Sequence, residues 1–244
     1  MNKEPALLTD FDALSFDCYG TLIDWESGIS AALAPWAARQ GVALTPEQLL
    51  ERYATAEALE EERTPGALYP DILAAAMRTL ATAVGTTATI EDCERLARSV
   101  AGWPAFPDSP AALALLAARY KLIILSNVDR TSFAGSNARL HIHFDAIVTA
   151  QDVGSYKPAA RNFEALLRAA GDLGVEHGRL LHVAQSLFHD HTPAHSAGLP
   201  TVWINRRQGR AGWGATPPPD CDVHPDWTFP SMAAFAAAAV AVDA

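Results

Sequence analysis

Short apolar runs of three or four residues recur along the chain and have the length and composition of buried β-strands. Five such runs are found, at residues 13–16, 122–125, 146–148, 180–183 and 201–204. Between the last four runs, the stretches 162–170 and 193–197 carry apolar residues at spacings that allow one buried helix face. Strands that alternate with helices favour an α/β fold, here with a mostly parallel, five-stranded sheet.

The interval from residue 25 to residue 102 has a different pattern. It is rich in Ala, Glu and Leu at helical spacing and contains no convincing strand. Within it, Thr45 followed by Pro46 predicts the start of a helix, because threonine caps helices and proline suits their first turn. We therefore expect a core domain formed by residues 1–24 and 103–244, with a helical domain, residues 25–102, inserted into it.

Composition and charge narrow the classes of partner. The chain has 244 residues, half of them apolar, and a formal net charge of −10 without a cluster of Lys and Arg. Such a chain offers no positive field for nucleic acid or for an anionic membrane surface. The first residues show neither a long apolar segment nor a cleavage site, so we expect a cytoplasmic protein. The widely spaced cysteines, Cys18, Cys93 and Cys221, favour reduced thiols over disulfides.

Polar residues that could take part in catalysis or binding follow four of the predicted strands. Asp17 follows the first strand, Ser126 and Asn127 the second, Lys157 lies beyond the third and Asp190 beyond the fourth. Taken singly, each is typical of a turn, a helix cap or a surface loop. Parallel sheets collect their active sites beyond the carboxyl ends of the strands, so the four positions together predict one site.

The order of these sites, with a helical insertion between the first two, resembles the haloacid dehalogenase superfamily over nearly the whole chain. The resemblance implies a Rossmann-like, three-layer core under an inserted helical cap, with Asp17 as nucleophile and Thr21 steadying its loop. Most superfamily members act on phosphate with magnesium and use a second aspartate, two residues later, as an acid. That position is Tyr19 here, and a phenol with a pKa of about 10 is a poor proton donor at neutral pH.

The stretch "DCYGTL", residues 17–22, therefore resembles the L-2-haloacid dehalogenase branch, in which a halide leaves without a proton. The resemblance implies hydrolysis of short L-2-haloalkanoic acids to 2-hydroxy acids. Asp17 attacks C2 with inversion, and water then hydrolyses the aspartyl ester. No cofactor and no metal are expected, the partner is a small halogenated carboxylic acid, and a homodimer is common in this branch.

The same resemblance assigns roles to the other residues. Lys157 is expected to hold Asp17 ionised and to lower its pKa, while Asp190 orients Lys157 and the hydrolytic water. The substrate carboxylate or the halide is expected to meet Ser126, Asn127 and the backbone N–H groups that follow Asp17, at Cys18 and Tyr19.

Some positions depart from the family patterns. Phosphatases carry Gly-Asp where this chain has Ala184 and Gln185, which weakens a magnesium site without removing Asp17 and Asp190 as ligands. A magnesium-dependent phosphatase for a small metabolite therefore stays an alternative. A third interpretation, a catalytically silent binding protein, is opposed by the intact Asp17, Ser126 and Lys157. Compared with dehalogenases, the stretch around Leu187 is one residue longer, and Phe163 replaces a tyrosine.

The insertion and the histidines leave two questions open. The family attracts the departing halide with an arginine of the cap, for which Arg52 is the candidate and Arg63 the fallback. A solvent-exposed arginine on a helix is an equally good interpretation of Arg52. His191 and His195 lie four residues apart, a spacing that can bind metal. Because no third ligand is evident, surface or capping roles are favoured for both.

Overall fold

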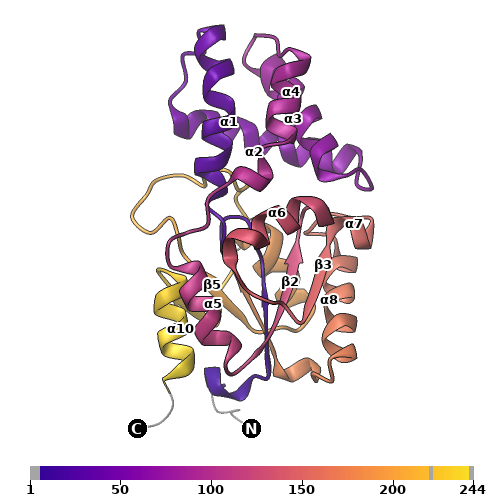
Figure 1. Cartoon of the computed structure of the whole chain (residues 1–244), viewed down its shortest axis with the longest axis vertical. Coiled ribbons are helices and arrows are strands. Elements are labelled where there is room, and N and C mark those ends of the chain that lie inside the picture. Colours follow the sequence, from indigo (N-terminus) through magenta and orange to yellow (C-terminus); the bar gives the residue numbers. More distant parts are fainter. Residues whose placement is uncertain (1–5, 220–221, 242–244) are drawn as a thin grey trace.

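The computed structural model describes residues 6–219 and 222–241, and its larger part is built on one sheet (Figure 1). The sheet has six strands in the order β3-β2-β1-β4-β5-β6. Every described pair of neighbouring strands is parallel. The strands are β1 (Ala13–Phe16), β2 (Lys121–Ser126), β3 (Ala146–Thr149), β4 (Leu180–Ala184), β5 (Thr201–Ile204) and β6 (Trp227–Phe229).

This architecture confirms the predicted α/β fold and parallel sheet, whereas the predicted count of five strands is wrong by one. The missed strand is β6, which has three residues, the middle one exposed, and lies at the edge of the sheet. Its sequence lacks the apolar run that marks a strand buried on both faces. The other five lie where the apolar runs predicted them.

Helices cover both faces of the sheet, giving three layers (Figure 1). Ile123 and Leu125 of β2 pack in a cluster with Phe163, while Leu122 and Ile124 belong to the cluster on the other face. This alternation follows from the two-residue period of a strand. The helices are α5 (Ser109–Ala117), α6 (Arg130–Leu140), α7 (Ala150–Val153), α8 (Ala160–Asp172), α9 (Thr192–Ser196) and α10 (Met232–Val240). Single turns are η1 (Leu8–Asp10), η2 (Val100–Gly102), η3 (His177–Arg179) and the π-helical η4 (Leu187–His191).

Four helices, which we call the cap helices, lie beyond the carboxyl ends of the strands (Figure 1). They are α1 (Trp25–Gln40), α2 (Pro46–Arg63), α3 (Tyr69–Ala83) and α4 (Ile90–Ala97). The helix start predicted at Thr45 is confirmed, since its hydroxyl accepts a hydrogen bond from the Gln48 N–H at 3.2 Å. No helix in the described residues is long and apolar enough to cross a membrane.

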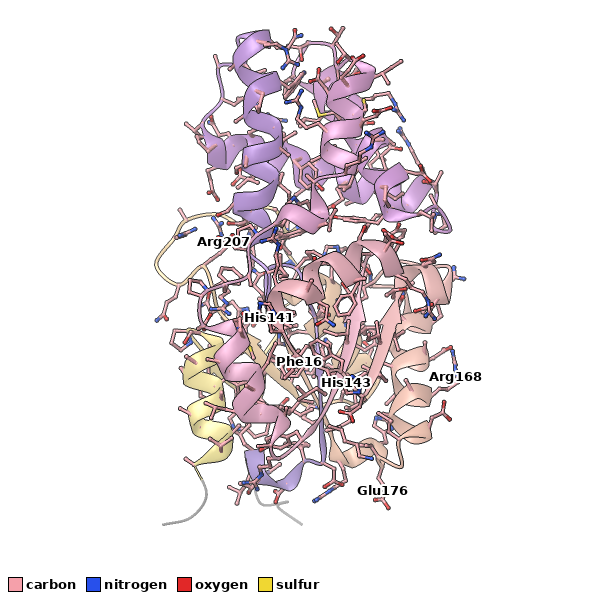
Figure 2. All side chains as sticks on the ribbon, viewed as in Figure 1. Phe16, His141, His143, Arg168, Glu176 and Arg207 are labelled. Atoms are coloured by element: carbon pink, nitrogen blue, oxygen red, sulfur yellow. The ribbon has the colours of Figure 1, made fainter. Side chains whose placement is uncertain are left out.

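A loop that follows β5 ties the core to the cap helices. Arg207 of this loop lies between the cap helices and the core, whereas Phe16 lies within the sheet (Figure 2). The guanidinium donates to both carboxylate oxygens of Glu26 in α1, at 2.9 and 2.6 Å, and also pairs with Glu47 in α2. These ion pairs hold the loop at the junction of the core and the cap helices, where it contributes Thr216 to the site described next.

The cysteines show no sign of pairing within the described residues. Cys18 and Cys93 are both buried free thiols. The third, Cys221, lies outside the described residues.

Candidate active site

Lys157 is buried between two carboxylates near the carboxyl ends of β1 and β4. Its Nζ lies 3.0 Å from Oδ1 of Asp17 and 2.6 Å from Oδ1 of Asp190, and it also donates to the Leu125 carbonyl at 3.2 Å. Burial acts to lower the pKa of Lys157, but the two carboxylates outweigh it and raise the pKa. The lysine therefore remains an ammonium, because removing it from water is compensated by these partners.

Both carboxylate oxygens of Asp17 accept a hydrogen bond. While Lys157 binds Oδ1, the Thr21 hydroxyl donates to Oδ2 at 2.7 Å and accepts from the Gln185 N–H at 2.9 Å. Burial raises the pKa of Asp17; the Asp190 charge adds to this, and the opposing Lys157 and Thr21 do not reverse it. The predicted lowering is thus corrected, because burial outweighs the ammonium. A dry, fixed carboxylate of this kind is a stronger nucleophile than a hydrated one.

Asp190 contacts a buried, hydrogen-bonded pair of side chains, His182 and Ser15. His182 Nε2 lies 2.9 Å from Asp190 Oδ1, and His182 Nδ1 lies 2.8 Å from the Ser15 hydroxyl. Burial acts to raise the pKa of Asp190, but Lys157 and His182 hold it well below its usual range. Sequence reasoning missed Ser15 and His182 as supports of the site. The sequence did hold a signal for them, since each is the polar residue of a strand that is otherwise apolar. In the structure the two residues face each other as register partners on β1 and β4.

Asn127 positions the loop that carries Lys157. Its Oδ1 accepts from the Lys157 N–H at 2.6 Å, and its Nδ2 donates to the Lys157 carbonyl at 3.1 Å. Both polar groups of the amide are therefore engaged with the backbone. Ser126 is buried, and its hydroxyl has no hydrogen-bond partner among the described residues.

The hydroxyl of Tyr19 is directed to a serine. It lies 2.8 Å from the Ser136 hydroxyl, and the ring packs edge-on against Trp103 at 5.5 Å. Burial raises the pKa of Tyr19 well above 10. The neighbouring Cys18 is buried, and burial likewise raises the pKa of its thiol. Neither side chain is suited to give up a proton at neutral pH.

We expect Tyr19→Phe to leave kcat within about threefold of wild type, because the phenol donates no proton to the substrate. The free energy of unfolding should fall by about 1 kcal/mol through loss of the hydrogen bond to Ser136. Ser136→Ala breaks the same bond without touching the phenol and is the matched control. A hundredfold loss of kcat in Tyr19→Phe alone would identify the phenol as a general acid.

Two cavities adjoin these residues, and they share part of their walls. The small cavity, about 30 Å³, lies beside Asp17 and has room for about one water molecule. The large cavity has a volume of about 880 Å³. Residues that line both are Glu61, Lys157, His189 and Thr216. The large cavity thus lies next to the small cavity at Asp17, between the cap helices and the core.

The cap helices contribute carboxyl groups to the small cavity. Oε1 of Glu57 accepts hydrogen bonds from the hydroxyls of Tyr53 at 2.7 Å and Tyr69 at 2.6 Å. Burial raises the pKa of Glu57 to about 7, and burial together with the Glu57 charge raises that of Glu61 well above its usual value. Sequence reasoning missed this cluster, although Tyr53, Glu57 and Glu61 are spaced four apart and so share a helix face.

The structure does not bring the candidate cap arginines to Asp17. Arg52 is exposed and lines neither cavity. Arg63 has 58% of its side chain exposed and pairs with Glu60 at 2.9 Å. Successive residues of a helix are rotated by about 100°, so Arg52 points to solvent where its neighbour Tyr53 points inward. Among the described residues that line the small cavity, Lys157 is the one Lys or Arg.

The extra residue near Leu187 is accommodated by the π-helical turn η4 (Leu187–His191), in which the His191 N–H reaches the Ser186 carbonyl at 3.3 Å. A π-turn holds one more residue than an α-turn, so Asp190 still points inward to Lys157. Phe163, at the position where the family offers a tyrosine, packs edge-on against His182 with 5.4 Å between ring centroids.

The side chains of the site do not make a good set of metal ligands. Asp17 and Asp190 both bind the Lys157 ammonium, and the Gln185 Oε1 accepts from Thr216 at 3.3 Å. In residues 6–219 and 222–241, no group of three or more His, Cys, Asp and Glu is placed to hold an ion. Magnesium prefers several oxygen ligands, including carboxylates, and this donor set does not fit it.

The side chains of His191 and His195 do not point to a common metal position. His191 is buried, with Nε2 3.0 Å from the Ala184 carbonyl, so the expected surface role is wrong for this residue. It does stand at the N-cap of α9, although its side chain makes no capping hydrogen bond. His195 is exposed, and its Nε2 lies 3.1 Å from the Thr201 hydroxyl.

Known structures share this fold. An L-2-haloacid dehalogenase from Xanthobacter autotrophicus, solved with chloropropionic acid covalently bound, superposes with a TM-score of 0.75 at 18% identity, covering 96% of this chain and 100% of that one. A defluorinating L-2-haloacid dehalogenase gives 0.73 at 22% identity over 93% and 94% of the chains. The HAD-hydrolase YfnB from Bacillus subtilis, bound to magnesium, gives 0.70 at 18% over 91% and 95%. At these identities the likeness shows the fold.

No curated protein matches the chain. The model of the haloacid dehalogenase-like hydrolases, in contrast, matches residues 11–197, which include Asp17, Lys157 and Asp190. Because this match covers most of the chain, the protein belongs to the haloacid dehalogenase-like hydrolase family.

Proposed function

We propose that this hydrolase cleaves the carbon–halogen bond of a 2-haloalkanoic acid through an ester on Asp17. The observation that carries the proposal is the setting of Asp17 at the small cavity, bound by Lys157 on one oxygen and by Thr21 on the other. Two residues further on, the Tyr19 hydroxyl is engaged with Ser136. A halide leaves as an anion and needs no proton, so a site without an acid at position 19 suits it.

Each step can be assigned to residues of the site. A carboxylate oxygen of Asp17 forms a bond to C2, and the carbon–halogen bond breaks with its electron pair leaving on the halide. Water then adds to the ester carbonyl carbon, and the bond between this carbon and the Asp17 oxygen attached to C2 breaks. The 2-hydroxy acid leaves with that oxygen, a proton is released, and the water oxygen stays in the Asp17 carboxylate. Lys157 balances the negative charge on the Asp17 carboxyl group during the second step, and ionised Asp190 keeps Lys157 in place.

Halide release from L-2-chloropropionate, measured with EDTA present, tests this proposal beside a panel of phosphate esters supplied with magnesium. We expect one halide and one lactate per substrate consumed, and no phosphate release. Phosphate release that requires magnesium, with no halide formed from any 2-haloacid, would overturn the proposal in favour of a phosphatase.

The carboxyl groups of the cap helices predict a pH dependence. Glu57, with its pKa raised to about 7, is a neutral acid below that pH and a carboxylate above it. An anionic substrate is repelled by the carboxylate, so we expect KM for a 2-haloacid to rise on the order of tenfold between about pH 6 and pH 8. Glu61 acts in the same sense, because its pKa is also raised.

Three other neighbouring groups, Lys157, Asp190 and His189, do not titrate in this window. The pKa of Lys157 is raised, that of Asp190 is held well below its usual range, and burial lowers that of His189 to about 4. Asp17 and Glu61, in contrast, have raised pKa values and add to the profile in both proteins. Steady-state kinetics over this range should therefore show a flatter KM profile for Glu57→Gln than for wild type. An identical slope in the two proteins would contradict the assignment to Glu57.

A further inference from the structure

The large cavity is far bigger than a short haloacid requires. Its volume of about 880 Å³ falls within the range of roughly 300–1,000 Å³ typical of pockets that bury drug-sized ligands. A substrate such as chloropropionate, with three carbon atoms, would leave most of this space to water.

Apolar side chains from four parts of the chain line this cavity. Helix α2, the segment around Lys157 and the loop after β5, together with the turn η4, contribute Ala54, Ala58, Leu59, Tyr156, Trp213 and, from η4, Phe188. The Tyr156 hydroxyl donates to the Ala67 carbonyl at 2.9 Å, so its polar end is satisfied and its ring remains as an apolar wall. Trp213 is 42% exposed, which is unusual for so large an apolar side chain and leaves surface for a ligand to cover.

The large cavity adjoins the small cavity at the reacting centre. Glu61, Lys157, His189 and Thr216 belong to the walls of both cavities, and Lys157 Nζ lies 3.0 Å from Asp17. A molecule whose reacting carbon lies at Asp17 would therefore extend past Lys157 into the large cavity. The charged side chains Glu51, Glu62 and Arg161 are also part of the lining and are exposed, which places them at its solvent end.

We propose that the substrate carries a bulky apolar group, an aryl group or a medium-length alkyl chain, which lies in the large cavity while its halogen-bearing carbon lies at Asp17. This inference rests on the proposed function for the reacting carbon and extends the substrate class beyond short acids. Burial of the substrate's alkyl chain removes apolar surface from water, and each added methylene should increase the affinity about fourfold.

Two measurements test the proposal and separate its failure from failure of the proposed function. In the first, kcat/KM for halide release is compared across 2-bromopropionate, 2-bromohexanoate, 2-bromooctanoate and 2-bromo-2-phenylacetate. We expect a rise of about fourfold per added methylene over at least three methylenes, or about 60-fold in all. A flat or falling series would overturn the apolar-group proposal while leaving dehalogenation intact.

The second measurement needs no turnover. Propionate, hexanoate and octanoate, which lack a halogen, are titrated into Asp17→Asn by calorimetry, and the dissociation constants should fall with chain length by the same factor. If length-dependent binding is seen but no haloacid is turned over, the proposed reaction fails and the apolar subsite stands. If no binding is detected for any chain length, the subsite is overturned.

Variants locate the subsite. Ala58→Trp fills the cavity from α2, and Trp213→Ala removes one of its walls; each should lower the ratio of octanoate to propionate affinity by about tenfold. Ala38→Trp, on the exposed face of α1 and outside both cavities, is the matched control and should keep the wild-type ratio. Trp213 is partly exposed, so its replacement keeps the test valid if Ala58→Trp folds poorly. Unchanged ratios in both cavity variants would overturn the proposal.

Discussion

We expect Asp17→Asn to lower kcat for halide release by about 10⁴-fold or more, because the amide has the shape of the carboxylate but cannot act as the nucleophile of the proposed reaction. Folding is expected to survive this change. In the wild type, one buried ammonium faces two carboxylates. The variant leaves Lys157 and Asp190 as a one-to-one pair, so the free energy of unfolding should stay the same or increase.

Stopped assays over long incubations, with the mass of the Asp17-containing peptide checked for deamidation, measure this effect. Asp12→Asn, at an exposed aspartate paired with Arg179 on the surface, is a matched control and should retain wild-type kcat. Turnover near the wild-type rate in undeamidated Asp17→Asn would remove Asp17 from the mechanism.

Replacing Lys157 should have the second large effect, on stability as well as on activity. Lys157→Met leaves Asp17 and Asp190 buried without a cation, and breaking a buried ion pair in this way costs about 3–5 kcal/mol. Both carboxyl pKa values then rise relative to the unfolded chain. The deficit should therefore be small at acidic pH, where both groups are protonated, and grow as the pH rises through the raised pKa values.

Denaturant unfolding at several pH values measures this loss, and the double variant Lys157→Met, Asp190→Asn controls for packing. The second change removes one of the two uncompensated charges, so it should restore a large part of the lost stability. A loss below about 1 kcal/mol in Lys157→Met at neutral pH would show that these carboxylates are solvated or protonated in the native protein.

The sheet was predictable from the sequence where its strands are apolar runs. β1 and β5 begin and end at the predicted residues, because strands buried on both faces carry little else. The meeting of Asp17, Lys157 and Asp190 also followed from the sequence, since the carboxyl ends of parallel strands lie at one edge. β6 was beyond this reasoning because an edge strand of three residues needs no apolar run.

Other features of the site depend on side-chain direction, which spacing alone does not determine. Arg52 and Tyr53 are adjacent, yet one is exposed and the other buried, and only packing of α2 on its neighbours decides between them. The raised pKa of Asp17 likewise depends on how completely the folded chain buries it. Ser15 and His182 could have been recognised, because a polar pair within two buried strands requires a partner such as Asp190.

The central claim is that Asp17 attacks C2 and forms a covalent ester, and the path of the solvent oxygen tests it most directly. A single turnover is run in heavy-oxygen water with enzyme in excess over L-2-chloropropionate and with EDTA present. If water attacks the ester carbonyl, the product hydroxyl comes from Asp17 and the solvent label enters its carboxylate. We predict largely unlabelled lactate and a labelled peptide containing Asp17, whereas labelled lactate with an unlabelled peptide would contradict covalent catalysis by Asp17.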